Sequence, residues 1–223
     1  MIYTRIFALV FTLFFTGCKK EENKTPETPK RTTTDNEATK RDNEAKEMKR
    51  VVEQAELRIK IQRLTSIGQT TLQQWCAGVS RYKSVYGFYP NIGASYTTTS
   101  DALHKLEAGP GIPFVKSLYG KNPTGSPLSG AATGDRAKYN RNAEEFCSFS
   151  NDNFDNSGIL IDVFGNSKIR VIFDTDGNGR IKNISEPDLP KEIAAISTVE
   201  GIPARVIIYT KGENGLPDIV AIQ

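Results

Sequence analysis

The residues with the clearest capacity for chemistry form an oxygen-rich loop late in the chain. Asp174, Asp176 and Asn178 occupy alternate positions, and Gly179 and Arg180 follow as the sixth and seventh residues of the same run. Calcium-binding loops carry side-chain oxygens at positions 1, 3 and 5, a glycine at position 6 for a sharp turn, and a backbone carbonyl at position 7. The spacing therefore predicts a weak calcium site that uses Asp174, Asp176, Asn178 and the Arg180 carbonyl.

The second half of this loop departs from the calcium-binding pattern. Position 12, where a glutamate normally supplies two oxygens, is Ser185, and Glu186 stands one place late. Since Ca²⁺ takes roughly six to eight oxygen ligands, Glu186 or water would have to complete the shell. The alternative is a plain hairpin turn between strands at 169–173 and 180–184, because Asp-Gly and Asn-Gly are preferred turn residues.

A cysteine near the amino terminus is the second candidate for chemistry. An apolar run over residues 6–15 follows Arg5 and ends shortly before Cys18, which is the layout of a secretory signal peptide. The run is shorter than the roughly 20 apolar residues that a membrane-spanning helix needs. Residues 15–18, Phe-Thr-Gly-Cys, resemble the lipobox of bacterial lipoproteins, with phenylalanine in the usual place of leucine.

The lipobox resemblance implies that residues 1–17 are cleaved and that Cys18 carries covalent lipid. In that family the cysteine sulfur receives a diacylglyceryl group and the new amino terminus is acylated, and several buried chains anchor stably at about 0.8 kcal/mol per methylene. Lys19 after the cysteine resembles outer-membrane sorting in enteric bacteria. We therefore expect a lipid-anchored protein of the bacterial cell envelope, at the outer membrane. An ordinary signal peptide with an unrelated cysteine is the alternative.

Two cysteines remain once Cys18 is assigned to lipid, and they are Cys76 and Cys147. Export to an oxidising compartment favours a disulfide between them. By loop entropy, closing a loop of about seventy residues would contribute on the order of 4 kcal/mol. Two reduced, buried thiols are the alternative. The sequence contains no Cys-x-x-Cys spacing or Cys/His cluster, so a zinc site is not expected.

The signatures of an active site are missing from the sequence. His104 is the only histidine, it falls in a segment expected to be a short surface helix, and no Gly-x-Ser-x-Gly motif or paired catalytic carboxylates accompany it. Trp75 and Tyr82 lie on an apolar helix stripe and are expected in the core. The formal net charge of +3 is small and well mixed, so nucleic acid is not an expected partner. We expect a protein that is not an enzyme.

The elements that must position these residues begin with a charged tether and a helix. Residues 18–40 are rich in Lys, Glu, Thr and Pro, which is typical of a disordered tether. Over residues 41–88 apolar side chains recur at spacings of three and four, which predicts one long amphipathic helix. Residues 91–157 form a variable loop region with a short helix at 100–107 and a Gly/Pro/Ser-rich stretch at 120–134.

β-branched runs separated by Gly, Asn and Asp turns occupy residues 158–223 and predict an antiparallel sheet. The expected strands are 158–162, 168–173, 179–183, 204–209 and 218–222. A long amino-terminal helix followed by such a meander predicts an α+β fold in which the helix covers one face of the sheet.

This order of parts resembles the soluble headgroup of type IV pilin-like proteins, in particular the major pseudopilins of type II secretion systems. Residues 82–90 are similar to their Tyr…Gly-x-Tyr-Pro helix exit, 101–106 to their short helix, and 162–166, Asp-Val-Phe-Gly-Asn, to their Asp-Pro-Trp-Gly-Asn turn. Residues 208–215 are similar to their closing loop. The resemblance implies a pilin-like domain over residues 41–223. It also implies a second calcium site, in a shortened last loop, at Glu213, Asn214 and Asp218.

The sequence departs from the pilin family in two features that bear on polymerisation. A lipobox replaces the pilin processing site, and charged residues such as Lys46, Lys49 and Arg50 replace the apolar half of the helix that forms a pilus core. Unpaired charges in an apolar core are costly, so ordinary polymerisation is not expected. The sequence predicts a lipid-tethered, non-catalytic pseudopilin-like component or accessory of a type II secretion or type IV pilus-like system. The alternative is an envelope lipoprotein that binds calcium or another envelope ligand without a secretion role.

Overall fold

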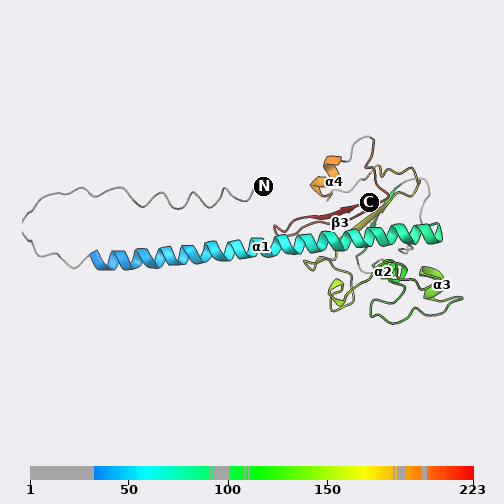
Figure 1. The fold of residues 1–223 in the computed structure, drawn as a ribbon, viewed down its shortest axis with the longest axis horizontal. Coiled ribbons are helices and arrows are strands. Elements are labelled where there is room, and N and C mark those ends of the chain that lie inside the picture. Colours follow the sequence, from blue (N-terminus) through cyan, green and yellow to red (C-terminus); the bar gives the residue numbers. More distant parts are fainter. Residues whose placement is uncertain are drawn as a thin grey trace, which may run out of the picture. The chain divides into compact units, whose positions relative to one another are not determined.

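The computed structural model describes residues 33–90, 92, 101–107, 109, 111–182, 184, 189–196 and 200–223. The predicted signal peptide, Cys18 and Glu186 lie outside these residues. The elements in chain order (Figure 1) are α1 Thr33–Tyr86, β1 Ala102–Lys105, α2 Gly111–Tyr119, α3 Asp135–Tyr139, a 3₁₀ turn at Asn151–Asn153, β2 Ile169–Phe173, α4 Lys191–Ile196, β3 Val206–Thr210 and β4 Ile219–Ile222. The predicted α+β fold with a long amino-terminal helix and an antiparallel sheet is confirmed.

Helix α1 starts earlier than the sequence indicates. It begins at Thr33 instead of residue 41, so the last part of the predicted tether is helical. That part continues into a run rich in Ala, Glu, Lys and Arg, whose favourable helix propensities sum over many residues. The helix ends at Tyr86, where Gly87 takes a φ of +81° and donates its N–H to the Lys83 carbonyl at 2.8 Å. A glycine in this left-handed conformation is a common helix stop.

The chain divides into two units, Met1–Val51 and Val52–Gln223, and α1 contributes residues to both. All later elements belong to the second unit. Within it, Figure 1 shows β3 beside the carboxyl-terminal part of α1, with α2 and α3 on one side of the helix and α4 on the other. Among the described residues, no helix combines the length and the apolar character needed to cross a bilayer.

The sheet has four strands in the order β1-β2-β3-β4, and every pair is antiparallel. The register places Val171 opposite both His104 and Ile208, and Ile208 opposite Ala221. Because side chains alternate between the faces of a strand, these residues share one face. Three of the predicted strands, over 168–173, 204–209 and 218–222, are confirmed to within two residues at each end.

The predicted short helix at 100–107 is wrong, because residues 102–105 form the edge strand β1. Leu103 and Leu106 stand three residues apart, which fits a helix face, and residues 102–105 show no apolar–polar alternation that would mark them as a strand. Pairing with β2 decides the outcome, because strand formation depends on neighbours far away in the sequence.

Two other predicted strands are also wrong. Within 158–162 only Leu160 forms an isolated bridge, to Phe154. Within the described residues 179–182 only Ile181 forms one, to Ile202. The hairpin between 169–173 and 180–184 therefore does not form. Strand β2 already has β1 on one edge and β3 on the other, so no edge is free for a third partner.

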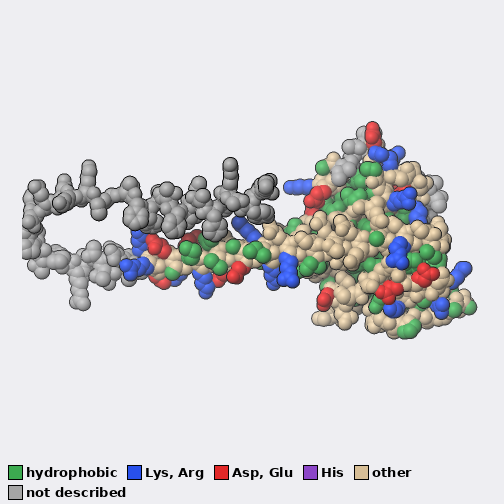
Figure 2. Space-filling model, in the orientation of Figure 1, with side chains coloured by type: hydrophobic (Ala, Val, Ile, Leu, Met, Phe, Trp, Pro, Cys, Tyr) green, Lys and Arg blue, Asp and Glu red, His purple; other side chains and the backbone are tan. Residues whose placement is uncertain are grey.

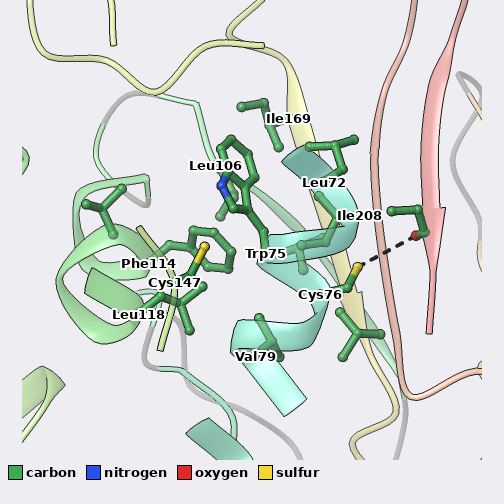
Figure 3. Packing of buried hydrophobic residues seen from close by; sticks show 14 of the residues in the cluster. Leu72, Trp75, Cys76, Val79, Leu106, Phe114, Leu118, Cys147, Ile169 and Ile208 are labelled. Carbon is green, nitrogen blue, oxygen red and sulfur yellow. Dashed lines mark hydrogen bonds between the residues drawn. The ribbon is translucent and has the colours of Figure 1, made fainter. Parts of the chain in front are cut away.

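The two faces of the sheet are covered by different elements. On one face α1 buries Leu72, Trp75, Val79 and Tyr82 against the sheet and against Phe114 of α2 (Figure 3). Trp75 stacks on Phe149 with ring centroids 5.3 Å apart, and Phe114 meets it edge-on at 6.3 Å. The predicted core positions of Trp75 and Tyr82 are confirmed. The opposite face carries a smaller cluster of Ile172, Ile181, Ile193, Ile202, Ala204, Ile207 and Tyr209.

Candidate metal centre

Three aspartates meet at one end of the β1–β2 pair. Antiparallel register places Ala102 opposite Phe173, so the residue before β1 and the residue after β2 lie at the same end. These residues are Asp101 and Asp174, and Asp176 follows two positions later in the loop. One carboxylate oxygen from each of the three lies within 4.8 Å of the others. The pairing of the strands thus assembles a cluster of three acidic groups.

Asp101 and Asp176 are each held by backbone N–H groups. Asp101 accepts the Thr175 N–H at Oδ1 at 3.1 Å and the Lys182 N–H at Oδ2 at 2.7 Å, so it fixes both arms of the loop. Asp176 accepts the backbone N–H of Asn178 at 3.0 Å and the Asn178 side-chain amide at 2.6 Å. Both carboxylates are therefore oriented before any ligand arrives.

Asp174 differs from the other two because it is buried, with 2% of its surface exposed. Its Oδ2 accepts the Gly179 N–H at 2.9 Å. Its Oδ1 is buried and has no hydrogen-bond partner among the described residues. Burying a carboxylate oxygen without a partner carries a large desolvation cost. This oxygen is the feature of the cluster that most requires an explanation.

The environment separates the acidities of the two loop aspartates. Burial is the main cause that raises the pKa of Asp174, and the neighbouring carboxylates of Asp176 and Asp101 act in the same direction. The Asn178 N–H is the main cause that lowers the pKa of Asp176. Without a cation, Asp174 therefore holds a proton more readily than Asp176.

One lysine lies beside the cluster. Lys83 of α1 places its Nζ 3.9 Å above the Tyr89 ring and 3.5 Å from the Asp174 carbonyl oxygen. Burial lowers the pKa of Lys83, and the charge of Asp174 opposes that shift. The ammonium group therefore offsets part of the negative charge of the cluster, while its hydrogen bond goes to a backbone oxygen.

The structure brings together two of the five predicted metal ligands. Asp174 and Asp176 converge, and Asn178 lies next to them with its Oδ1 accepting the Arg180 N–H at 2.7 Å. The Arg180 side chain donates to the carbonyls of Glu200 and Gly201. The predicted ligand, the Arg180 backbone carbonyl, stays a prediction. Glu186 lies outside the described residues.

Asp101 was missed because its position depends on the pairing of two strands far apart in the sequence. No local pattern at or after residue 101 marks Asp101 as a ligand. Identifying 102–105 as a strand beside 169–173 would have placed Asp101 next to Asp174.

The second predicted calcium site, in the last loop, is occupied by other contacts. Glu213 forms an ion pair with Lys168, and Asp218 Oδ1 accepts the Gly212 N–H at 2.9 Å. Asn214 adopts a φ of +54° in the turn. Glu213 and Asp218 are thus engaged in contacts within the protein, and a calcium site at Glu213, Asn214 and Asp218 stays a prediction.

Cys76 and Cys147 are both buried free thiols. Figure 3 shows the Cys76 sulfur directed toward β4, where it lies 3.8 Å from the Ala221 carbonyl oxygen, and Cys147 on the side of α2. Burial is the main cause that raises the pKa of each thiol, to about 12. This arrangement corresponds to the alternative of two reduced thiols, and the disulfide remains a prediction for the exported protein.

The predicted surface position of His104 is wrong. On β1 it faces the buried side of the sheet, is 8% exposed, and lies with its ring centroid 5.6 Å from that of Phe173. Burial lowers the pKa of His104 to about 4. The imidazole is therefore neutral at physiological pH and acts as part of the core.

No family model, curated protein or solved structure matches this chain. Functional assignment consequently depends on the residues and geometry of the chain itself.

Proposed function

We propose that the protein is a non-catalytic, lipid-anchored, pilin-like component or accessory of a type II secretion or type IV pilus-like system in the bacterial envelope. The observation that carries the proposal is the organisation of α1. Its carboxyl-terminal stretch packs on a four-stranded antiparallel sheet, and the stretch before it carries apolar side chains that the domain leaves exposed.

The exposed apolar side chains on α1 provide a surface for a partner. Within the second unit, Val52, Leu57, Ile59 and Ile67 are between 45% and 66% exposed. Figure 2 shows hydrophobic side chains interspersed with charged ones along this helix. Apolar groups separated by charges suit a mixed helix–helix contact better than the dry core of a fibre. A fixed subunit beside other envelope proteins fits this surface.

The helix exit supports the pilin-like interpretation. Tyr89 stacks on Phe173 of β2 with centroids 4.6 Å apart, and its hydroxyl donates to the Arg205 carbonyl at 3.1 Å. Tyr86 packs on Tyr82 at 4.7 Å and donates its hydroxyl to Asn140 Oδ1 at 2.9 Å. The tyrosines of the exit motif thus fasten the end of α1 to the sheet and to the loop region.

The turn at 162–166 supports the same interpretation. Asp162 Oδ1 accepts the N–H groups of Phe164 and Asn166 at 2.8 and 2.9 Å. The Asn166 amide then donates to the Lys211 carbonyl at 2.7 Å, which ties the turn to the connection between β3 and β4. The aspartate and the asparagine at the ends of the turn therefore both have structural roles.

Site-specific photocrosslinking in intact cells tests the proposal. A photoreactive amino acid at Leu57 or Ile59 should crosslink to a helix-bearing component of a secretion or pilus assembly. The matched control is the same amino acid at Asp152, which is exposed on the headgroup. Labelling at 57 and 59 that does not exceed the control would contradict a partner on this helix.

Palmitate labelling tests the anchor separately. Cys18→Ala should abolish lipid incorporation and either release the protein from membranes or leave an uncleaved precursor. A lipoprotein that binds calcium or another envelope ligand without a secretion role would keep its lipid and give no crosslink at residues 57 and 59. Retained labelling in the variant would contradict lipidation at Cys18.

A further inference from the structure

We propose that Asp101, Asp174 and Asp176 form a binding site for a divalent cation of the calcium type, which fastens the start of β1 to the loop that leaves β2. The site does not rest on the pilin-like role, because the ligands belong to the headgroup alone. Asp101 is the decisive addition, since it comes from a distant part of the chain and supplies a third carboxylate.

The buried Oδ1 of Asp174 points to a ligand. The other carboxylate oxygen of Asp174, Oδ2, already accepts an N–H group, and so do both oxygens of Asp101 and of Asp176. Oδ1 alone is buried with no partner in the described part of the chain, and it belongs to a group of three like charges. A bound cation would satisfy this oxygen and remove the repulsion among the carboxylates at the same time.

Other aspartates in the molecule show that an acidic turn does not by itself need an ion. Asp155 Oδ1 accepts the N–H groups of Ser157 and Ile159, both at 2.8 Å, and Asp162 Oδ1 likewise accepts two N–H groups. Neither residue belongs to a group of carboxylates in the described chain, and neither leaves a buried oxygen without a partner. The cluster of Asp101, Asp174 and Asp176 differs on both counts.

The spacing of the oxygens fits calcium. Ca²⁺ binds oxygen at about 2.3–2.6 Å, so two ligands of one ion lie no more than about 5.2 Å apart. The three carboxylate oxygens lie within 4.8 Å of one another. Mg²⁺ demands near-octahedral geometry at about 2.1 Å and gives up its water ligands reluctantly, so a site of three protein carboxylates suits it less well than Ca²⁺. Oxygen donors without histidine or thiolate also favour a hard cation over zinc.

The same features predict weak binding. Three side chains supply fewer than the roughly six to eight oxygens that Ca²⁺ takes, so water must complete the shell. The Lys83 ammonium beside the Asp174 carbonyl also opposes a second positive charge. We expect a Kd of about 10⁻⁴–10⁻³ M, the range of extracellular calcium modules.

Calcium titration of the full chain, freed of metal by chelation, tests the site. Thermal melting is recorded in chelator, in about 10 mM CaCl₂ and in MgCl₂ at equal ionic strength. Calcium should raise the wild-type midpoint by a few degrees, which is the shift expected for an ion at about ten times its Kd in a domain of this size. Magnesium should raise it less, and an equal shift would overturn the assignment to calcium.

Asp174→Asn is the decisive variant because it should not destabilise the calcium-free protein and should remove the stabilisation by calcium. Asparagine keeps an oxygen for the Gly179 N–H and replaces the unpartnered Oδ1 with an N–H₂ group that can donate to Asp101 or Asp176. In chelator the variant should melt at or above the wild-type temperature, and calcium should no longer shift it. The control Asp152→Asn makes the same charge change at an exposed site and should keep the full calcium shift.

Asp176→Asn provides a second test at an exposed position, and asparagine keeps an oxygen that can accept the Asn178 N–H. It should weaken calcium binding by about tenfold in isothermal titration. A wild-type melting temperature indifferent to calcium and chelator would overturn the site, as would Asp174→Asn with an undiminished shift. Either result would leave crosslinking at Leu57 and Ile59 unaffected, so the site and the proposed function can fail separately.

Discussion

Two stretches of one helix behave differently in the second unit of this protein. Residues 52–67 of α1 contain no buried side chain, although Val52, Leu57 and Ile59 are apolar. Residues 68–86 bury Leu72, Trp75 and others to 1% exposure or less. Both stretches repeat apolar residues at helical spacing. Periodicity therefore indicates which face of a helix is apolar, and the reach of the sheet and of the loops that pack on it decides which part of that face is covered.

The difference has an energetic consequence. The packed stretch gains free energy from burial of about 25 cal/mol per Å² of apolar surface, whereas the exposed stretch depends on helix propensity and local side-chain bonds. Such local terms contribute about 0.2–0.5 kcal/mol each. Substitutions in the two stretches should therefore differ in magnitude and, at some positions, in sign.

The largest expected effect is at Trp75. Trp75→Ala removes the side chain that stacks on Phe149 and meets Phe114, and it should lower the free energy of unfolding by about 3–5 kcal/mol. Leu57→Ala removes an exposed side chain from the other stretch and should change stability by less than about 0.5 kcal/mol. Urea denaturation followed by circular dichroism measures both. Similar losses would mean that the exposed stretch is packed in solution.

The second-largest expected effect is a pH dependence of stability that comes from the buried His104. The folded-state pKa of His104, about 4, lies below the unfolded value of 6.5, so between these values the unfolded chain binds more protons. Stability should therefore be full above about pH 6.5 and fall by up to about 3 kcal/mol as the pH drops to about 4. His104→Gln should remove this part of the pH dependence. An unchanged difference between pH 7 and pH 4.5 would show that the imidazole is open to water.

Two helix glycines test how closely α1 approaches its neighbours. A Cβ on Gly78 would lie 2.8 Å from Cys147 Cβ and 3.3 Å from the Phe146 carbonyl oxygen, which cannot move without shifting the backbone. Gly78→Ala should cost about 1–2 kcal/mol, even after the gain of about 1 kcal/mol in helix propensity.

Gly68→Ala is the matched control for that substitution. Its Cβ would meet the Ile219 Cδ1 atom at 2.6 Å and Val163 Cγ2 at 3.0 Å, and both are ends of side chains. Rotation of Ile219 can relieve the contact, so the change should be near neutral. Denaturation midpoints of the two variants measure the difference. A larger loss of stability for Gly68→Ala than for Gly78→Ala would contradict a closer backbone approach at Gly78.

Local sequence patterns account for most of the fold and for part of the site. β2, β3 and β4 were predictable because their runs of β-branched residues are dense and bounded by turn residues. β1 was not, because residues 102–105 show neither apolar–polar alternation nor β-branched side chains, and only their pairing with β2 makes them a strand. Residues 158–162 and 179–182 show the opposite case, because these apolar-containing runs form only single bridges, at Leu160 and Ile181, and do not join the sheet.

The candidate metal centre divides in the same way. Asp174 and Asp176 are two residues apart, so local spacing identifies them, whereas Asp101 reaches them only through the register of two strands. The burial of His104 has the same origin, because its place on β1 sets the face toward which it points. Features that depend on long-range pairing were beyond single-sequence reasoning in both instances.

The smallest expected effect concerns two exposed serines with the same local chemistry in the two stretches. Ser66 donates its hydroxyl to the Gln62 carbonyl at 3.1 Å, and Ser84 donates to the Ser80 carbonyl at 2.9 Å. Each bond competes with the helical backbone pattern, and alanine is the better helix former by about 0.5 kcal/mol. Both Ser66→Ala and Ser84→Ala should therefore stabilise the helix in which they lie.

The readout separates the two stretches. Residues around Ser84 unfold with the core, because Val79 and Tyr82 beside it are buried, so Ser84→Ala should raise the urea midpoint by the full increment. Ser66 precedes the first buried residue, Gly68, where fraying exposes the backbone without unfolding the sheet. Ser66→Ala should consequently slow amide hydrogen exchange near residues 62–66 and leave the urea midpoint almost unchanged. Equal midpoint shifts for the two variants would mean that the exposed and the packed stretch unfold as one cooperative element, and the contrast between them would then concern solvent exposure alone.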